Sequence, residues 1–535
     1  MGPPPGRGQG PGLGPVGRDH PGSQLARPAP GRGVSSLAEI LPGHARARPD
    51  RVALVAGDRV TTFGALEERV RRAAGALAAA GVGPGDRVAV LLGNVPEFVE
   101  VVHGAWRVGA AVAPLNVMLT SEEIGYVLAD ADAGVVVSGR ALVPSVLAVR
   151  DRLAGLEQVL VTGRGPSPRR TDSYEKALSR AAEPPRTEVD PDDLAVLAYT
   201  SGTTAEPKGA MLTHGNLLSN LDMIRAVPAL AEAESDVVLA ALPLFHIFGL
   251  ATLGLVLREG GTAVLVERFD PASTLELVAR HGVTVLPGAP PMFQAWLATP
   301  GTSDLSSVRL AVSGAAPLPA AVLEAFRDRF DITIWEGYGL TETSPVVTTT
   351  ALGHEARPGS IGLPLPGVEV ELVDEHGAEV EEGDPGQIVV RGANVFAGYW
   401  RRPDETKAAF RDGWLLTGDV AYRDDDGYLH IVDRTKDVII VSGFNVFPKE
   451  VEDAIGLHPK VAECVVLGVP DERTGEAVKA LVVARPGETL TEDEVLDRCR
   501  DSLARFKWPR HIEVVGSLPK HVTGKVLRRA LREDG

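Results

Sequence analysis

The stretch Tyr199-Thr200-Ser201-Gly202-Thr203-Thr204-Ala205-Glu206-Pro207-Lys208-Gly209 gathers hydroxyl, glycine and lysine residues directly after an apolar run, Leu194 to Tyr199. Glycines let backbone N–H groups approach an anion, hydroxyls add donors, and a lysine adds positive charge. The stretch therefore predicts a phosphate-binding loop between a strand and a helix that begins near Thr213. It is not a Walker loop, because its lysine does not stand between a glycine and a Ser or Thr. An ordinary surface turn is the alternative.

Further short motifs follow this loop at consistent spacing: Ser313 to Pro317 (SGAAP), Glu336 to Glu342 (EGYGLTE), Gly386 to Tyr399 (GQIVVRGANVFAGY), Trp414 to Val420 (WLLTGDV), Asp433 to Glu450 (DRTKDVIIVSGFNVFPKE) and Pro519 to Lys525 (PKHVTGK). Together with the loop they resemble the motifs of the adenylate-forming superfamily, most closely its acyl-CoA synthetase branch and the bacterial medium- and long-chain fatty-acyl-CoA ligases. The resemblance covers about residues 34 to 535. One departure is Ala205, where the family usually has glycine.

The fold expected from the residues and from the resemblance is α/β. Short apolar runs alternate with helical patterns, which predicts parallel-rich sheets with packed helices in a large N-terminal domain, residues 34–434. The polar, Pro-containing segment from Gly165 to Asp193 looks like a linker. After Asp433 the pattern predicts a small, mobile α+β C-terminal domain, residues 435–535. Residues 1–33 are rich in Gly and Pro and lack an apolar signal segment, so they predict a disordered tail.

Composition excludes some classes of partner. The chain has 535 residues and a formal net charge of −17, which disfavours nucleic acids and anionic membranes as primary partners. Cys464 and Cys499 have no zinc-ligand spacing and suggest a reducing, cytoplasmic compartment in which both are buried. The uncharged stretch from Leu239 to Leu257 is long enough to span a bilayer. Pro243 and the glycines within it instead favour a strand from Val237 and a buried helix from about Ile247.

The resemblance implies that ATP, Mg²⁺ and coenzyme A take part in the reaction. Activation of a carboxylate requires attack on the α-phosphate of ATP while a metal ion neutralises charge. Glu342 and Thr200 are the implied metal ligands, and Lys525 is the implied mobile catalytic lysine. The implied nucleotide contacts are Thr200, Ser201, Gly202, Thr203, Thr204, Lys208, Gly314, Ala315, Ala316, Glu336, Gly337, Tyr338, Gly339, Leu340, Thr341, Asp419 and Arg434.

A second group of residues is implied for the thiol step. Lys436 occupies the position at which the small domain of the family turns between adenylation and thioester formation. Ser442 and Gly443 match the segment that lines the pantetheine tunnel of coenzyme A. A glycine there lets the thiol arm pass close to the backbone. The acceptor is therefore expected to be coenzyme A, with an acyl carrier protein as the alternative.

The acid is expected to lie near His246, with Gly288, Gly314, Gly337, Gly339 and Val346 along its pocket. No aspartate lies between Val237 and Glu259, which disfavours an amino-acid substrate. The apolar Val346 and the likeness of the segment from Val441 to Pro448 to fatty-acyl-CoA ligases favour a fatty acid. An aryl acid, as in coumarate ligases, is an alternative. A nucleotide-binding pseudoenzyme is the alternative from another class, which the presence of Glu342 and Lys525 disfavours.

Overall fold

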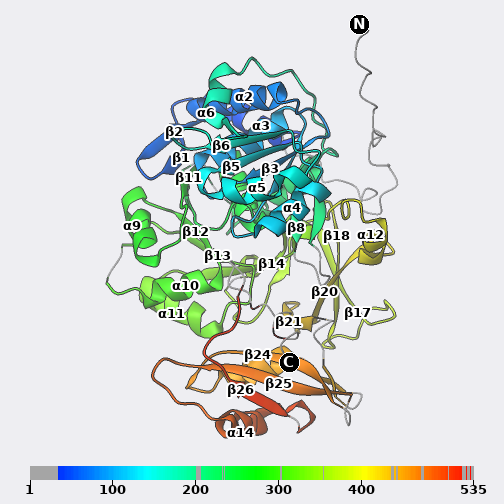
Figure 1. Cartoon of the computed structure of the whole chain (residues 1–535). Coiled ribbons are helices and arrows are strands. Elements are labelled where there is room, and N and C mark those ends of the chain that lie inside the picture. The colour runs from blue at the N-terminus through cyan, green and yellow to red at the C-terminus, as the bar shows by residue number, and fades with distance from the viewer. Residues whose placement is uncertain are drawn as a thin grey trace.

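The computed structural model describes residues 34–531 apart from 201–206, 232, 234, 302–303, 354, 435–438, 442–443, 447, 472–474, 504, 521–525 and 527–530. It has a large N-terminal domain with three sheets and a small C-terminal domain with one sheet. Figure 1 shows the small domain, in orange and red, at one end of the molecule.

The first large sheet has seven strands in the order β7-β6-β5-β3-β4-β8-β9. Neighbouring strands are parallel except β8 and β9, which form an antiparallel pair. The strands are β3 (Arg87–Leu91), β4 (Ala111–Pro114), β5 (Val135–Gly139), β6 (Gln158–Thr162), β7 (Asp172–Ser173), β8 (Leu194–Thr200) and β9 (Lys208–Thr213). The helices that belong to this part of the chain are α2 (Phe63–Ala79), α3 (Pro96–Arg107), α4 (Ser121–Asp130), α5 (Val143–Val149), α6 (Tyr174–Arg180) and α7 (His214–Arg225).

The second large sheet has nine strands in the order β16-β15-β14-β13-β12-β10-β11-β1-β2. It is parallel from β14 to β1 and antiparallel at both edges. The strands are β1 (Val52–Ala56), β2 (Arg59–Thr62), β10 (Val237–Ala240), β11 (Thr262–Leu265), β12 (Val285–Gly288), β13 (Leu310–Ser313), β14 (Ile334–Gly339), β15 (Val346–Thr349) and β16 (Leu363–Pro364). The helices of this part are α1 (Ile40–Ala47), α8 (Ile247–Glu259), α9 (Pro271–His281), α10 (Pro290–Ala298) and α11 (Ala320–Phe330).

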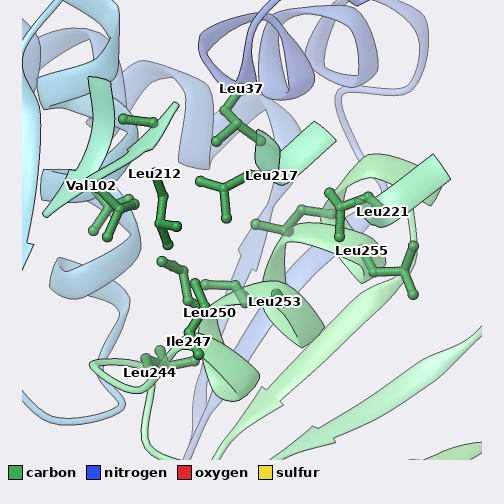
Figure 2. Packing of buried hydrophobic residues seen from close by; sticks show 14 of the residues in the cluster. Leu37, Val102, Leu212, Leu217, Leu221, Leu244, Ile247, Leu250, Leu253 and Leu255 are labelled. Carbon is green, nitrogen blue, oxygen red and sulfur yellow. The ribbon is translucent and has the colours of Figure 1, made fainter. Parts of the chain in front are cut away.

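Helix α8 packs into the core between the large sheets. Figure 2 shows Leu250 and Leu253 of this helix directed toward Leu212, Leu217 and other buried leucines. Its apolar character therefore reflects burial on several sides, as expected for a core helix. The helix has 13 residues. Among the helices of the described residues, none is both long enough and apolar enough to cross a membrane.

The third sheet and the small domain complete the fold. The third sheet joins β17 (Val368–Val373), β18 (Gly386–Gly392), β19 (Phe410–Arg411), β20 (Trp414–Arg423) and β21 (Leu429–Arg434), with α12 (Pro403–Ala409) beside it. The small domain contains β22 (Ile439–Val441), β23 (Phe444–Val446), α13 (Pro448–Gly456), β24 (Val461–Asp471), β25 (Gly475–Ala484), α14 (Glu492–Ser502) and β26 (His511–Val514). Its buried side chains, such as Ile439, Val466 and Ile512, form a cluster of their own. The boundary at 434/435 remains a prediction.

Two expectations from the sequence are wrong. The segment from Gly165 to Asp193 is not a simple linker, because it contains β7 and α6. The Tyr174 ring of α6 is buried, and its hydroxyl donates to the buried Glu100 carboxylate at 3.1 Å. Cys499 is buried as expected, whereas Cys464 is only partly buried.

Candidate active site

Several predicted site residues lie at the carboxyl ends of neighbouring parallel strands. Strands β14, β13, β12 and β10 are adjacent in the nine-stranded sheet. Gly288 ends β12, Gly314 follows β13, Gly337 lies near the end of β14, and His246 lies in the loop after β10. Ligands of open α/β sheets bind at this edge, because loops there diverge and leave a crevice. Residues predicted from separate motifs are therefore brought together by the sheet.

The loop after β13 is held in an unusual backbone conformation. Gly314 N–H donates to the Gly288 carbonyl at 3.3 Å, and Ala315 has a φ of +70°. A positive φ is uncommon for a residue with a side chain, and such residues cluster at functional sites. Ala315 is exposed at this loop. The loop is thus open to solvent at Ala315, whereas Gly314 before it is buried, and contact of this loop with adenine remains a prediction.

Glu336 on β14 supports this loop through a hydrogen bond. Its carboxylate accepts a hydrogen bond from Leu318 N–H at 3.1 Å, and only 7% of the residue is exposed. Burial raises the pKa of Glu336 to about 8, against the lowering effects of the Leu318 hydrogen bond and the charge of Lys449. Lys449 belongs to α13 of the small domain. The side chain of Glu336 therefore holds the loop through Leu318, and its contact with the nucleotide remains a prediction.

Tyr338 and Asp419 meet across two sheets. The Tyr338 hydroxyl donates to Asp419 Oδ2 at 2.7 Å, and Asp419 is 5% exposed. Asp419 N–H in turn donates to Thr417 Oγ1 at 3.1 Å. An ionised carboxylate is an acceptor with about four lone-pair sites, a chemistry that suits ribose hydroxyls. The register of β20 and β21 places the backbone of Arg434 opposite Asp419.

The predicted phosphate loop connects two antiparallel strands. Thr200 at the end of β8 is paired with Lys208 at the start of β9, so both ends of the loop are fixed together. The Tyr126 hydroxyl donates to the Pro207 carbonyl at 3.1 Å and holds the second end. A helix after the loop is expected from the sequence, whereas strand β9 is not. That helix begins as expected, with the Thr213 side chain accepting from Asn216 N–H.

Glu342 is the candidate magnesium ligand. It lies in a short 3₁₀ turn, Thr341–Thr343, after β14. Its Oε1 atom accepts a hydrogen bond from the Tyr399 hydroxyl at 2.8 Å. In the part of the chain that the structure describes, no group of three or more His, Cys, Asp or Glu residues could hold a metal ion. A single carboxylate with nearby hydroxyls fits Mg²⁺, which is commonly bound through one or two carboxylates, substrate phosphates and water.

His246 lies at the start of α8 as its N-cap residue. Its Nδ1 atom accepts from Phe248 N–H at 3.3 Å. With Nδ1 as acceptor, the proton of a neutral imidazole is on Nε2, which is then the donor. The residue is partly buried. A donor at this place can orient a carboxylate without carrying full charge.

The four glycines expected along the acyl pocket differ in what surrounds them. A Cβ atom on Gly314 would lie 3.0 Å from Phe248 Cε1, and one on Gly337 would lie 4.0 Å from Val346 Cγ1. The space beside Gly288 is filled by Phe293, at 3.0 Å, and that beside Gly339 by the Pro345 carbonyl, at 1.8 Å. Glycine is thus needed at 288 and 339 for packing within the protein, and their place along the acyl pocket remains a prediction.

Several predicted residues lie outside the described residues: Ser201, Gly202, Thr203, Thr204, Lys436, Ser442, Gly443 and Lys525. Two site residues were not singled out from the sequence. Tyr399 ends the quoted motif that begins at Gly386, and its partner Glu342 is 57 positions away. Phe248 lies two residues after His246. Their positions within recognised motifs were the available signal, but their contacts depend on the fold.

Comparison with known proteins agrees with this geometry. The AMP-binding enzyme family matches residues 41–400, and the AMP-binding enzyme C-terminal domain matches residues 450–525. A feruloyl-CoA synthase from Amycolatopsis sp is 41% identical over 495 residues, covering 91% of this chain and 96% of the relative. A long-chain-fatty-acid–CoA ligase from Bacillus subtilis is 36% identical over 529 residues, covering 93% and 94%.

A solved structure supports the same family assignment. The ATP-bound MatB of Rhodopseudomonas palustris superposes with a TM-score of 0.85 at 35% identity, covering 93% of this chain and 98% of MatB. The family models together account for both domains, and the full-length relatives extend the match through the segment between them. The chain therefore belongs to the AMP-binding enzyme family, in the acyl-CoA synthetase branch of the adenylate-forming proteins.

Proposed function

We propose that this protein is an ATP-dependent acyl-CoA synthetase that converts a medium- or long-chain fatty acid into its coenzyme A thioester. The observation that carries the proposal is the convergence of the Gly314–Ala316 loop, Asp419 and Glu342 at one edge of the sheets. A flat surface for adenine, an acceptor for ribose and a carboxylate for a cation are the parts that adenylation requires.

In the first half-reaction, an oxygen of the acid attacks the α-phosphorus of ATP and the bond to pyrophosphate breaks. His246 donates from Nε2 to the acid, and Lys208 with the loop beside Thr200 holds the phosphates. Mg²⁺, when bound at Glu342 and Thr200, supplies positive charge that neutralises the phosphate oxygens. The positioned groups contribute mainly alignment and electrostatic stabilisation, as in other phosphoryl-transfer reactions. The products are acyl-AMP and pyrophosphate.

In the second half-reaction, the thiol of coenzyme A attacks the acyl carbonyl of acyl-AMP. The carbon–oxygen bond to AMP breaks, the thioester forms, and the thiol proton leaves to solvent. The resemblance assigns the path of the thiol arm to Ser442 and Gly443, and the change of domain orientation to the segment around Lys436. The thiolate is the attacking species, so access and alignment govern this step.

The substrate class rests on the pocket. No aspartate faces this region from the stretch Val237 to Glu259, and Val346 and Phe248 are apolar. An acid with an apolar chain fits these walls. An aryl acid is the second candidate, because feruloyl-CoA synthases are among the relatives and because the Phe248 ring lies beside Gly314. A phenyl ring there could stack on that side chain.

A substrate panel tests the proposal. Purified protein is incubated with ATP, Mg²⁺ and coenzyme A, together with octanoate, palmitate, ferulate or acetate, and the thioester and AMP are measured by mass spectrometry. The highest kcat/KM should be for octanoate or palmitate, with equal amounts of thioester and AMP. A higher kcat/KM for ferulate would show that the substrate is an aryl acid and not a fatty acid. Transfer of the acyl group to a phosphopantetheinyl carrier protein but not to coenzyme A would show that the acceptor is the carrier protein.

A further inference from the structure

The segment Asn394–Trp400 connects the Glu342 turn with the strand that carries Lys208. Phe396 N–H donates to the Glu342 carbonyl at 2.9 Å, and the Asn394 side chain donates to the Thr343 carbonyl at 2.9 Å. On its other side the segment exchanges backbone hydrogen bonds with β9: Ala397 N–H to Met211 O and Met211 N–H to Gly398 O at 2.9 Å, and Trp400 N–H to Gly209 O at 2.8 Å.

This segment therefore fixes the two large sheets to each other at the active site. Strand β9 belongs to the seven-stranded sheet, and the Glu342 turn follows β14 of the nine-stranded sheet. Figure 1 shows β14 and β18 in the region where the third sheet meets the two large sheets. The distance between Lys208 and Glu342 is thus set by hydrogen bonds that pass through one short segment.

The side chain of Tyr399, which lies in this segment, contacts Glu342 and Lys208 directly. Its hydroxyl donates to Glu342 Oε1 at 2.8 Å, and Lys208 Nζ lies 5.4 Å from the centroid of its ring. The ring is held by an edge contact with the buried Phe396, with centroids 4.9 Å apart. The backbone N–H of Tyr399 donates to Thr406 Oγ1 at 2.9 Å. One side chain therefore contacts both a carboxylate and an ammonium group of the site.

We propose that Tyr399 is a positioning residue that orients Glu342 for the metal ion and Lys208 for the phosphates. This inference rests on the proposed function. The hydroxyl occupies Oε1, so Glu342 presents Oε2 to a cation. A neutral donor orients the carboxylate but leaves its negative charge in place, whereas an arginine or lysine would neutralise it. Mg²⁺ demands near-ideal geometry, and loss of a partner that orients a ligand typically reduces metal affinity about 10–100-fold.

The ring has a separate effect on Lys208. An ammonium group over an aromatic face is attracted by the negative face of the ring. This attraction limits the positions that the flexible lysine side chain can adopt. The hydroxyl thus acts through the metal ligand, and the ring acts on a direct phosphate contact. Two substitutions separate these effects: Tyr399→Phe keeps the ring, and Tyr399→Leu removes both.

The test compares the affinity for ATP with and without metal, measured by titration calorimetry in excess Mg²⁺ and in EDTA. Tyr399→Phe should raise Kd about 10-fold in Mg²⁺ and leave it unchanged in EDTA. Tyr399→Leu should raise Kd in both. Tyr174→Phe is the matched control, because it also removes a hydroxyl that donates to a buried carboxylate, Glu100, far along the chain from this site. It should leave both affinities unchanged.

Two other results for Tyr399→Phe would contradict the proposal. An unchanged Kd in Mg²⁺ for Tyr399→Phe, or an equal rise in Mg²⁺ and in EDTA, overturns the positioning role. Acid-dependent pyrophosphate release by the wild type, measured in the same Mg²⁺ buffer, reports separately on the proposed function. A wild type that neither binds ATP nor releases pyrophosphate overturns the proposed function and, with it, this inference.

Discussion

The Tyr338 hydroxyl donates a hydrogen bond of 2.7 Å to Asp419 Oδ2, joining β14 of the nine-stranded sheet to β20 of the third sheet. The aromatic face proposed for adenine and the acceptor proposed for ribose are thereby fixed relative to each other. The two residues come from motifs 81 positions apart. The proposed nucleotide site therefore depends on how the two sheets assemble.

Asp419→Asn should weaken nucleotide binding more than Tyr338→Phe. The first change removes the charge that strengthens hydrogen bonds to ribose, each worth about 1.5–3 kcal/mol. The second removes one neutral donor, worth about 0.5–1.5 kcal/mol. The KM for ATP should therefore rise about 10–100-fold in Asp419→Asn and about 2–10-fold in Tyr338→Phe, measured by acid-dependent pyrophosphate release. Equal effects would show that Asp419 acts only through Tyr338.

Glu342→Gln should reduce pyrophosphate release about 100-fold, which corresponds to roughly 3 kcal/mol at the transition state. The substitution keeps the shape of the side chain and removes the charge for the metal ion. Raising Mg²⁺ should restore part of the rate. Near-normal activity at ordinary Mg²⁺ would exclude Glu342 as a metal ligand.

Much of this arrangement could be predicted from the sequence, because it depends on local signals. The short apolar runs at β3 to β6 predict buried parallel strands, and the Thr213 cap predicts the start of α7. Pro243 and the glycines near it correctly predict a buried helix instead of a membrane span.

Other features depend on contacts between distant residues and could not be read locally. The burial of Tyr174 depends on Glu100, 74 positions earlier. The need for glycine at 339 arises from the close approach of the Pro345 carbonyl. Strand β9 follows a loop rich in small residues, and it becomes a strand because it pairs with β8. The pairing of Tyr399 with Glu342 likewise requires the folded sheets.

Glu336→Gln should stabilise the protein increasingly as pH rises. Burial raises the pKa of Glu336 to about 8 from its usual 4.5. Between these values the folded state holds a proton that the unfolded state has lost, so stability falls as pH increases. Glutamine cannot ionise, and its amide oxygen can still accept from Leu318 N–H. The difference in melting temperature, mutant minus wild type, should grow by roughly 2–4 °C between pH 5 and 8.

Glu369→Gln is the control for this measurement, because Glu369 lies near the surface and pairs with Arg391. The pKa of Glu369 is lowered by that hydrogen bond. Its stabilising effect is present above its usual pKa and is lost as pH falls, so the mutant should gain no advantage at high pH. A difference in melting temperature between Glu336→Gln and wild type that does not change with pH would mean that Glu336 is already ionised in the folded protein at neutral pH.

Gly314→Ala should reduce activity through a clash with Phe248. The added Cβ would lie 3.0 Å from Phe248 Cε1, and overpacking typically costs about 1–3 kcal/mol. Phe248→Leu should restore part of the loss when combined with Gly314→Ala. The double-mutant cycle is measured as kcat/KM for octanoate and palmitate, and palmitate should lose more. Additive losses would show that Gly314 serves only the adenine loop.

Lys525→Ala and Gly443→Leu should separate the two half-reactions. Lys525 is expected to stabilise charge only while acyl-AMP forms, so its loss should stop that step but not the conversion of supplied acyl-AMP and coenzyme A. Gly443→Leu should allow acyl-AMP to accumulate while little thioester appears, because the thiol path is narrowed. Equal loss of both half-reactions in both variants would contradict the proposal that the small domain takes a different orientation for each half-reaction.

The central claim is that an acid is activated as an adenylate before any thiol takes part. Acid-dependent exchange of labelled pyrophosphate into ATP, measured with Mg²⁺ and without coenzyme A, tests this most directly. The account predicts rapid exchange only when acid is present, and conversion of the accumulated acyl-AMP to thioester and AMP when coenzyme A is added. Exchange that does not depend on acid, or formation of ADP and phosphate in place of AMP and pyrophosphate, would contradict it.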